Sequence, residues 1–124
     1  MENLKIPNTK YTLGVNFDVE TGILEMSGTS YPENAIDYFQ KIFDWIKTYM
    51  SNQHRPIVLN LKLDYLNTSS TKCILDILEL LEQYYKNGND VVLNWYYAED
   101  DEDILETGKE FAEDIDLPLN FISY

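Results

Sequence analysis

Four hydroxyl side chains follow one another directly after Asn67: Thr68, Ser69, Ser70 and Thr71. Hydroxyl groups in such a run have three chemical uses. They cap the N-terminus of a helix, they act as nucleophiles beside a base, or they accept a phosphoryl group. The elements that position the run, and the partners available elsewhere in the chain, decide among these uses.

The run lies at the junction between a predicted strand and a predicted helix. Residues 57–66 predict a central strand with five alternating apolar residues on one face: Ile57, Leu59, Leu61, Leu63 and Tyr65. Behind the run, apolar residues at spacings of three and four predict a helix to about Lys86, where Asn87-Gly88 ends it. Ligands and chemistry gather at the carboxyl ends of strands in open α/β sheets, so this junction is the candidate site.

The predicted helix start is electrostatically unusual. Its unpaired backbone N–H groups carry partial positive charge, which acidic residues in the first turn commonly offset. This helix has no acid before Asp76, and its first charged residue is Lys72. A phosphate on one of the four hydroxyls would bring about −1.5 to −2 charges to this helix start. The junction could therefore accept such a charge with little damage to the fold, although ordinary N-capping explains the same residues.

Two further regions complete the predicted sheet and helices. Residues 11–18 and 23–27 alternate on either side of Glu20-Thr21-Gly22 and predict a β-hairpin. Ser30 and Glu33 form a capping box, which predicts an amphipathic helix that starts near Ser30 and ends before residues 51–53.

The second half of the chain continues this alternation of strands and helices. Residues 91–97 predict a strand, residues 99–116 an acidic helix, and residues 119–122 a short last strand. The predicted order is therefore ββαβαβαβ. This is an α/β fold: one domain over residues 1–124, with a mixed, mainly parallel sheet, an N-terminal β-hairpin and about three helices.

Charge and composition narrow the possible partners and the compartment. The 124 residues hold 22 acids and 9 bases, a net charge of −13, which argues against nucleic acid and anionic membranes as partners. A single cysteine, Cys73, suits a reducing cytoplasm. Residues 1–10 have no apolar signal-peptide core, and no stretch approaches the length of a membrane span. We therefore expect a soluble cytoplasmic protein without membrane insertion.

The histidine, cysteine and glycine content argues against an enzyme. The chain has one histidine, His54, in a polar stretch that is typical of a solvated loop. One histidine and one cysteine far apart in sequence do not indicate a zinc site, and Cys73 falls in an apolar helical pattern typical of the core. Neither glycine-rich phosphate-binding motif occurs. We therefore expect no enzyme, no cofactor and no metal. A hydrolase that uses a junction hydroxyl would need His54 as its base.

The acidic segment at residues 99–116 supports a second hypothesis. It holds one base, Lys109, and ten acids: Glu99, Asp100, Asp101, Glu102, Asp103, Glu106, Glu110, Glu113, Asp114 and Asp116. Acids at a helix start complement the macrodipole, and the others are typical of a solvated face. The alternative is a constitutive acidic module that binds a protein partner through residues 99–116.

Three motifs, in order and over nearly the whole chain, resemble the SiaC family of bacterial regulatory phosphoproteins. They are Ser30-Tyr31-Pro32-Glu33-Asn34, then Tyr65-Leu66-Asn67-Thr68-Ser69-Ser70, then Trp95-Tyr96-Tyr97 with the acidic residues 100–103 and 110–114. The resemblance implies a fold like the STAS domains of anti-sigma-factor antagonists. It also implies that a cognate protein kinase phosphorylates Thr68, with Asn67, Ser69, Ser70 and Lys72 around it, and that a PP2C-type phosphatase removes the phosphate.

The resemblance further implies partner switching. In the family, the unphosphorylated form binds and activates a diguanylate cyclase, so we expect an effector of that kind. Four tyrosines could belong to the docking surface or to the core: Tyr31, Tyr65, Tyr96 and Tyr97.

Overall fold

A computed structural model describes residues 1–52 and 54–124 of the chain. Gln53, in the polar segment predicted to follow the first helix, lies outside the described residues. The elements run in the order β1 (Leu4–Ile6), β2 (Gly14–Phe17), β3 (Ile23–Ser30), α1 (Ala35–Asn52), β4 (Ile57–Leu66), α2 (Thr68–Lys86), β5 (Val91–Tyr97), α3 (Glu102–Asp114) and β6 (Leu119–Ser123).

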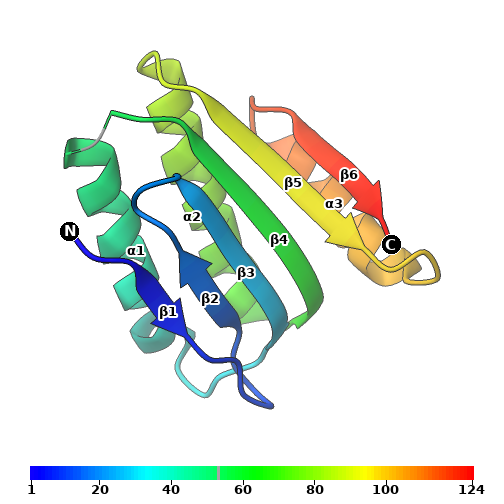
Figure 1. Cartoon of the computed structure of the whole chain (residues 1–124). Helices are drawn as coiled ribbons and strands as arrows, with labels where there is room; N and C mark the ends of the chain where they lie inside the picture. Colours follow the sequence, from blue (N-terminus) through cyan, green and yellow to red (C-terminus); the bar gives the residue numbers. More distant parts are fainter. Residues whose placement is uncertain (53) are drawn as a thin grey trace.

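The strands form one mixed sheet in which neighbours in sequence are also neighbours in space (Figure 1). β1, β2 and β3 pair antiparallel, whereas β3, β4, β5 and β6 pair parallel. The predicted mixed sheet with an N-terminal hairpin is confirmed, but the predicted order lacked β1. Three residues before Pro7 are too short to show an alternating pattern, and β1 exists because Leu4 and Ile6 pair with Phe17 and Val15.

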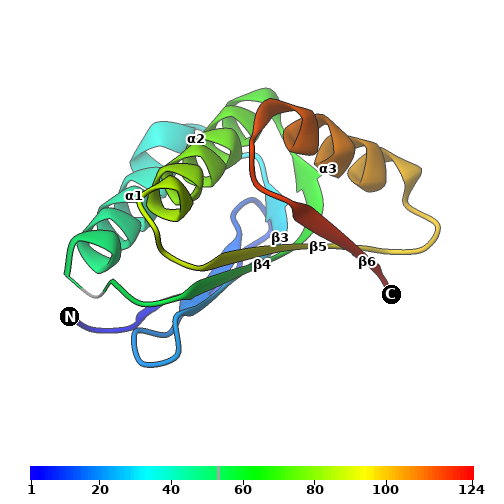
Figure 2. The same ribbon diagram turned by 90° about the horizontal axis from the view of Figure 1, so that it is seen from above.

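All three helices lie on one face of the sheet (Figure 2). Each helix connects two adjacent parallel strands, and the strand order never reverses. Because such crossovers are almost always right-handed, successive crossovers in one direction place their helices on the same side. The sheet therefore has one covered face and one open face, and it lacks the crevice that a reversal of strand order creates.

The core lies between the helices and the covered face. Alternate residues of β4 are buried there (Ile57, Leu59, Leu61 and Leu63), together with Trp95 of β5. The open face is polar: the Asn120 side-chain amide donates to Asn94 Oδ1 at 3.1 Å, and the Asn94 amide donates to Asn60 Oδ1 at 2.9 Å. Among the described residues, no helix is both long and apolar enough to cross a membrane.

The predicted capping box at Ser30 is wrong. β3 continues through Ser30, which pairs with Leu66 of β4, and α1 begins only at Ala35. Asn34 takes the capping role, since its Oδ1 accepts from the backbone N–H of Asp37 at 3.2 Å. Pairing with the neighbouring parallel strand outweighed the local capping signal, because a strand residue gains its hydrogen bonds from a segment distant in sequence.

Other boundaries shift by a few residues. The first strand of the hairpin is Gly14–Phe17, within the predicted 11–18. The acidic helix is shorter than the predicted 99–116, because Asp101 caps it: Asp101 Oδ1 accepts from the Ile104 N–H at 3.0 Å. The predicted strands at 57–66 and 91–97 are confirmed with the same bounds, and α2 ends at Lys86 as predicted.

Candidate functional site

The junction between β4 and α2 begins with a side-chain cap. Asn67 has extended backbone angles, φ −75° and ψ 174°, and its Oδ1 accepts from the Ser70 N–H at 2.9 Å. This satisfies one of the free N–H groups in the first turn of α2. The N-cap is therefore Asn67, and the four hydroxyls that follow it are not needed for that role.

The four hydroxyls differ in what they contact. Ser70 is fully buried, and its Oγ lies 2.7 Å from Ser30 Oγ. The Thr71 hydroxyl is half-buried and donates to the Asn67 carbonyl oxygen at 3.0 Å. Thr68 and Ser69 are exposed. Of the run, these two are therefore the hydroxyls that a second protein can reach without any change in the backbone.

The predicted electrostatics of the helix start are confirmed. The first turn of α2 contains no acid, whereas α1 has Asp37 there and α3 has Glu102 and Asp103. The positive end of the α2 dipole is thus the least offset of the three.

Lys72 does not point its charge at this helix start. Its Nζ lies 2.9 Å from Asp76 Oδ1, one turn further along α2, and this hydrogen bond raises the pKa of the ammonium. Because the Lys72 side chain is largely exposed and that of Asp76 is partly exposed, the ion pair contributes little to stability and can open when another anion arrives.

A neighbouring strand holds the junction in place. The Asn67 N–H donates to the Ser30 carbonyl at 2.9 Å, and the Ser30–Ser70 hydroxyl contact lies beside it. Ser30 is therefore a structural partner of the site, although the local sequence pattern indicates a helix cap there. No local sequence signal could identify it, because its partner Ser70 lies forty residues away.

Tyr65 faces solvent, which corrects its predicted place on the buried face of residues 57–66. The β3–β4 register shifts so that Gly28 pairs with Leu63 and Thr29 with Tyr65, which leaves Asp64 without a partner in β3. This bulge interrupts the alternation, and the Tyr65 side chain is 54% exposed. The sequence signal was Gly28, which takes φ +100° within its strand.

A groove opens beside Thr68 between α2 and α3. Its volume is about 290 Å³, and it is lined by Thr68, Thr71, Lys72 and Leu75 of α2 and by Thr107, Glu110, Phe111 and Asp114 of α3. A phosphate on Thr68 would share this groove with two carboxylates, Glu110 and Asp114, which the sequence pattern does not reveal.

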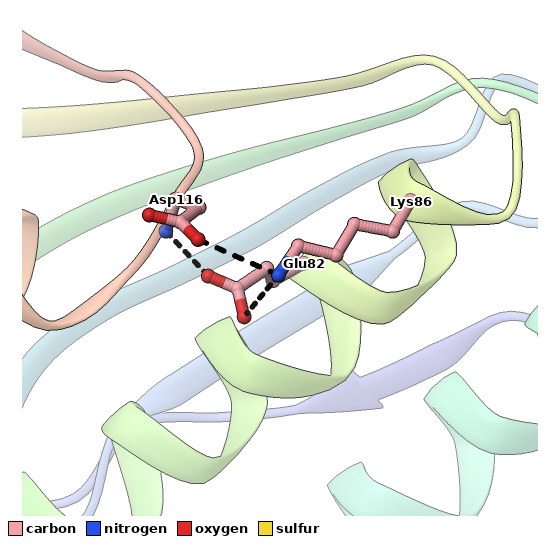
Figure 3. A network of polar contacts seen from close by, with 3 residues as sticks. All are labelled: Glu82, Lys86 and Asp116. Atoms are coloured by element: carbon pink, nitrogen blue, oxygen red, sulfur yellow. Dashed lines mark hydrogen bonds and ion pairs between the residues drawn. The ribbon is translucent and has the colours of Figure 1, made fainter.

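A network of polar contacts lies further along α2. Lys86 Nζ lies 3.7 Å from Glu82 Oε1 and 3.5 Å from Asp116 Oδ2, and Glu82 accepts from the Asp116 N–H (Figure 3). These contacts tie the segment after α3 to α2.

Other candidate groups lie elsewhere. His54 precedes β4 and Thr68 follows it, and a ten-residue strand spans roughly 30 Å, so the histidine and the hydroxyl lie at opposite ends. Cys73 is buried, as predicted, and burial raises the pKa of its thiol. Tyr96 lines a cavity that includes residues of the open face, and Tyr97 packs against the core. Tyr31 and Tyr65 are exposed at the junction.

Comparison with known proteins identifies the family. Residues 6–124 match the model of the SiaC family regulatory phosphoproteins. The chain belongs to this family. An uncharacterised protein of Pseudomonas aeruginosa strain UCBPP-PA14 is 42% identical over 119 residues, which cover 96% of this chain and 94% of that protein.

Solved structures of the family have the same fold. The crystal structure of apo-SiaC from Pseudomonas aeruginosa matches with a TM-score of 0.92 and 40% identity, over 98% of this chain and 99% of that chain. A chain in the crystal structure of the diguanylate cyclase SiaD bound to its activator SiaC, from the same species, matches with a TM-score of 0.93 and 40% identity, again over 98% and 99%.

Proposed function

We propose that this protein is a partner-switching phosphoprotein in which Thr68 is reversibly phosphorylated. A cognate kinase transfers the phosphoryl group of ATP to Thr68 Oγ1, and a PP2C-type phosphatase removes it. The unphosphorylated form binds an effector, a diguanylate cyclase of the kind that SiaC activates in Pseudomonas aeruginosa. The family match supports the regulatory role, and the resemblance at Asn67-Thr68-Ser69-Ser70 selects the residue.

The position of Thr68 supports the proposal. Thr68 is the first residue of α2, its side chain is exposed, and Asn67 already provides the cap. The hydroxyl is therefore free for modification. The backbone N–H groups of an acid-free first turn can partly offset the charge that the phosphate brings.

The proposed switch acts locally. A phosphate at Thr68 adds bulk and about two negative charges to a surface where a partner sits. Glu110 and Asp114 line the same groove and outnumber the one cation in its lining, Lys72, which is paired with Asp76, so the groove does not neutralise the phosphate. Burying the dianion under a partner would remove its hydration without a matching counter-charge, and the partner is released. The packed core does not need to move.

Peptide mapping tests the modification. The protein is purified from its own organism, with and without phosphatase treatment, and analysed by intact mass and by mapping of residues 65–75. We expect one phosphate on Thr68, lost after phosphatase treatment and absent from Thr68→Ala but present in Ser69→Ala. Phosphate on Ser69 alone would place the site one residue later. Its absence under several growth conditions would refute the proposal.

A matched pair of variants tests the effect of charge on binding. Thr68→Asp and Thr68→Asn have nearly the same shape, so the charge is the main difference between them. We expect Thr68→Asn to bind the effector nearly as well as Thr68→Ala, and Thr68→Asp to bind at least about tenfold more weakly. Equal binding of Asp and Asn variants in titration calorimetry would contradict release by charge.

The acidic-module alternative predicts a different result. If residues 99–116 bind a basic partner constitutively, binding survives Thr68→Ala and Thr68→Asp alike and weakens steeply with salt. In the structure, Asp101 caps α3, and Glu102 and Asp103 lie in its first turn. These three acids therefore already have a structural explanation, and the phosphoswitch is the favoured function.

A further inference from the structure

Three segments that meet at one end of the sheet carry no charged residue. They are residues 11–14, 26–32 and 65–71, and we call them together the neutral island. A quarter of the chain is charged, and yet none of these eighteen residues is. Charged residues directly border the segments at Lys10, Glu25, Glu33, Asp64 and Lys72. In a protein of net charge −13, three uncharged segments that meet at one place are a feature that needs an explanation.

Hydrogen bonds bring the three segments together. The Tyr31 N–H donates to the Tyr11 carbonyl at 2.9 Å, and the Asn67 N–H donates to the Ser30 carbonyl at 2.9 Å. Thr29 pairs with Tyr65 across the β3–β4 ladder. The neutral island is thus one connected region, in which Leu13, Met26, Ser30 and Ser70 are buried.

Three tyrosine rings stand exposed on the neutral island. Tyr11, Tyr31 and Tyr65 are 50%, 37% and 54% exposed. Their rings form an edge-to-face chain, with centroids 5.0 Å apart between Tyr11 and Tyr31 and 6.1 Å between Tyr31 and Tyr65. Mutual contact fixes the rings, so little side-chain entropy remains to be lost when a partner covers them. Contiguous exposed aromatic surface of this kind marks interaction sites, and tyrosine is a preferred hot-spot residue.

Thr68 lies within the area that a partner on these rings would cover. Thr68 is three positions after Tyr65, so their Cα atoms are at most about 11 Å apart. A standard interface buries about 800 Å² on each partner, which corresponds to a radius of roughly 16 Å. A partner centred on Tyr65 therefore reaches Thr68.

Resting on the proposed function, we propose that the effector docks on Tyr11, Tyr31 and Tyr65 through an uncharged, apolar surface of its own. The absence of charge on the neutral island is the argument for this chemistry. Asp64, Asp101 and Asp103 line a pocket with Tyr65 and Leu66 at the border of the neutral island, so a basic partner would gain most at that border. An apolar surface instead fits the eighteen uncharged residues themselves. The same property explains why one phosphate suffices, because an uncharged partner supplies no counter-charge to a dianion at Thr68.

The first experiment measures binding of ring-deletion variants. The probe is the purified diguanylate cyclase of the protein's own source organism, titrated with the full-length unphosphorylated chain. We expect Tyr31→Ala and Tyr65→Ala each to weaken binding by at least about tenfold, and Tyr31→Phe to retain it because the ring provides the contact. Tyr85→Ala is the matched control: Tyr85 is 46% exposed, lies near the C-terminal end of α2, and should be silent.

The second experiment tests whether the effector surface that covers the neutral island is charged. Ser69 is exposed on the neutral island, so Ser69→Asp and Ser69→Lys introduce either sign beside Thr68 without altering it. An apolar partner binds both variants at least about fivefold more weakly than Ser69→Ala, and its Kd changes little between low and high salt. If Ser69→Asp binds more tightly than Ser69→Ala and the affinity falls with salt, the docking surface of the effector is basic and the proposal is wrong.

A third measurement separates this inference from the proposed function. Phosphorylation of Thr68 in the Tyr65→Ala variant is followed by peptide mapping and should proceed as in the wild type. If the wild-type chain is phosphorylated and binds the cyclase while the tyrosine variants bind equally well, the docking surface lies elsewhere and the phosphoswitch stands. If the wild-type chain binds no cyclase, the proposed function fails and the docking surface fails with it.

Discussion

At the scale of single residues, burial separates hydroxyls that look alike in the sequence. Ser70 contributes its hydroxyl to a buried pair with Ser30, while Ser69 beside it faces solvent. Composition and spacing identify residues 68–71 as a candidate site, but they do not show which of the four hydroxyls is exposed. That distinction depends on Ser30, which reaches the site from a different strand.

Removal of one partner of the buried pair should destabilise the fold. Ser70→Ala leaves the Ser30 hydroxyl buried without a partner, and we expect a loss of about 1–3 kcal/mol in the free energy of unfolding. The double variant Ser30→Ala/Ser70→Ala should lose less than the sum of the single variants, because no orphaned hydroxyl remains. Urea unfolding measures these values. The exposed control Ser69→Ala should stay within about 0.5 kcal/mol of the wild type, and an additive double variant would contradict the pair.

At the scale of elements, tertiary pairing decided the boundaries that local signals misplaced. The Ser30/Glu33 capping box is a genuine sequence pattern, but β3 runs on because its pairing with β4 extends to Leu66. Likewise Tyr65 follows the apolar alternation of its strand and still points outward, because the bulge at Asp64 reverses the faces. The bounds of β5, whose pattern agreed with its tertiary contacts, were predicted correctly, and so were those of β4 despite the bulge.

A substitution at Gly108 tests how closely α3 packs against the sheet. A Cβ at this position would lie 2.6 Å from Trp95 Nε1, whose N–H donates to the Ile104 carbonyl at 3.0 Å. Gly108→Ala gains up to about 1 kcal/mol of helix propensity, but overpacking against a fully buried ring costs about 1–3 kcal/mol. We expect a lower midpoint of urea unfolding, whereas the exposed Glu106→Ala changes little. A more stable Gly108→Ala would show that α3 does not approach Trp95 this closely.

At the scale of the whole molecule, three tyrosine hydroxyls with raised pKa values link stability to alkaline pH. Burial raises the pKa of Tyr38 to about 12, and its hydroxyl donates to the Leu13 carbonyl at 2.6 Å. Burial also raises the pKa values of Tyr49 and Tyr84, whose hydroxyls donate to backbone carbonyls of the segment before β4. These groups hold their protons in the folded state at a pH where the unfolded chain has released them.

The sign of the pH dependence follows from that difference. Above pH 10 the unfolded state binds fewer protons than the folded state, so the free energy of unfolding falls as the pH rises from about 10 towards 12. Tyr38→Phe removes one such group. We expect this variant to be less stable than the wild type at pH 8, because the Leu13 carbonyl loses its donor, and the gap to narrow by pH 11. Chemical denaturation at the two pH values measures it. A gap that widens at pH 11 would contradict the raised pKa.

The sequence by itself determined the alternation of strands and helices and the place of the strand-to-helix junction. It also determined the acid-free start of α2 and, through three short motifs, the family. These properties are local or compositional, so they can be read along the chain. The tertiary structure alone decided which hydroxyls stay exposed, on which face of the sheet the helices lie, and that three uncharged segments meet around Thr68. Burial and contact between segments tens of residues apart arise from strand pairing and crossover handedness, which no local pattern encodes.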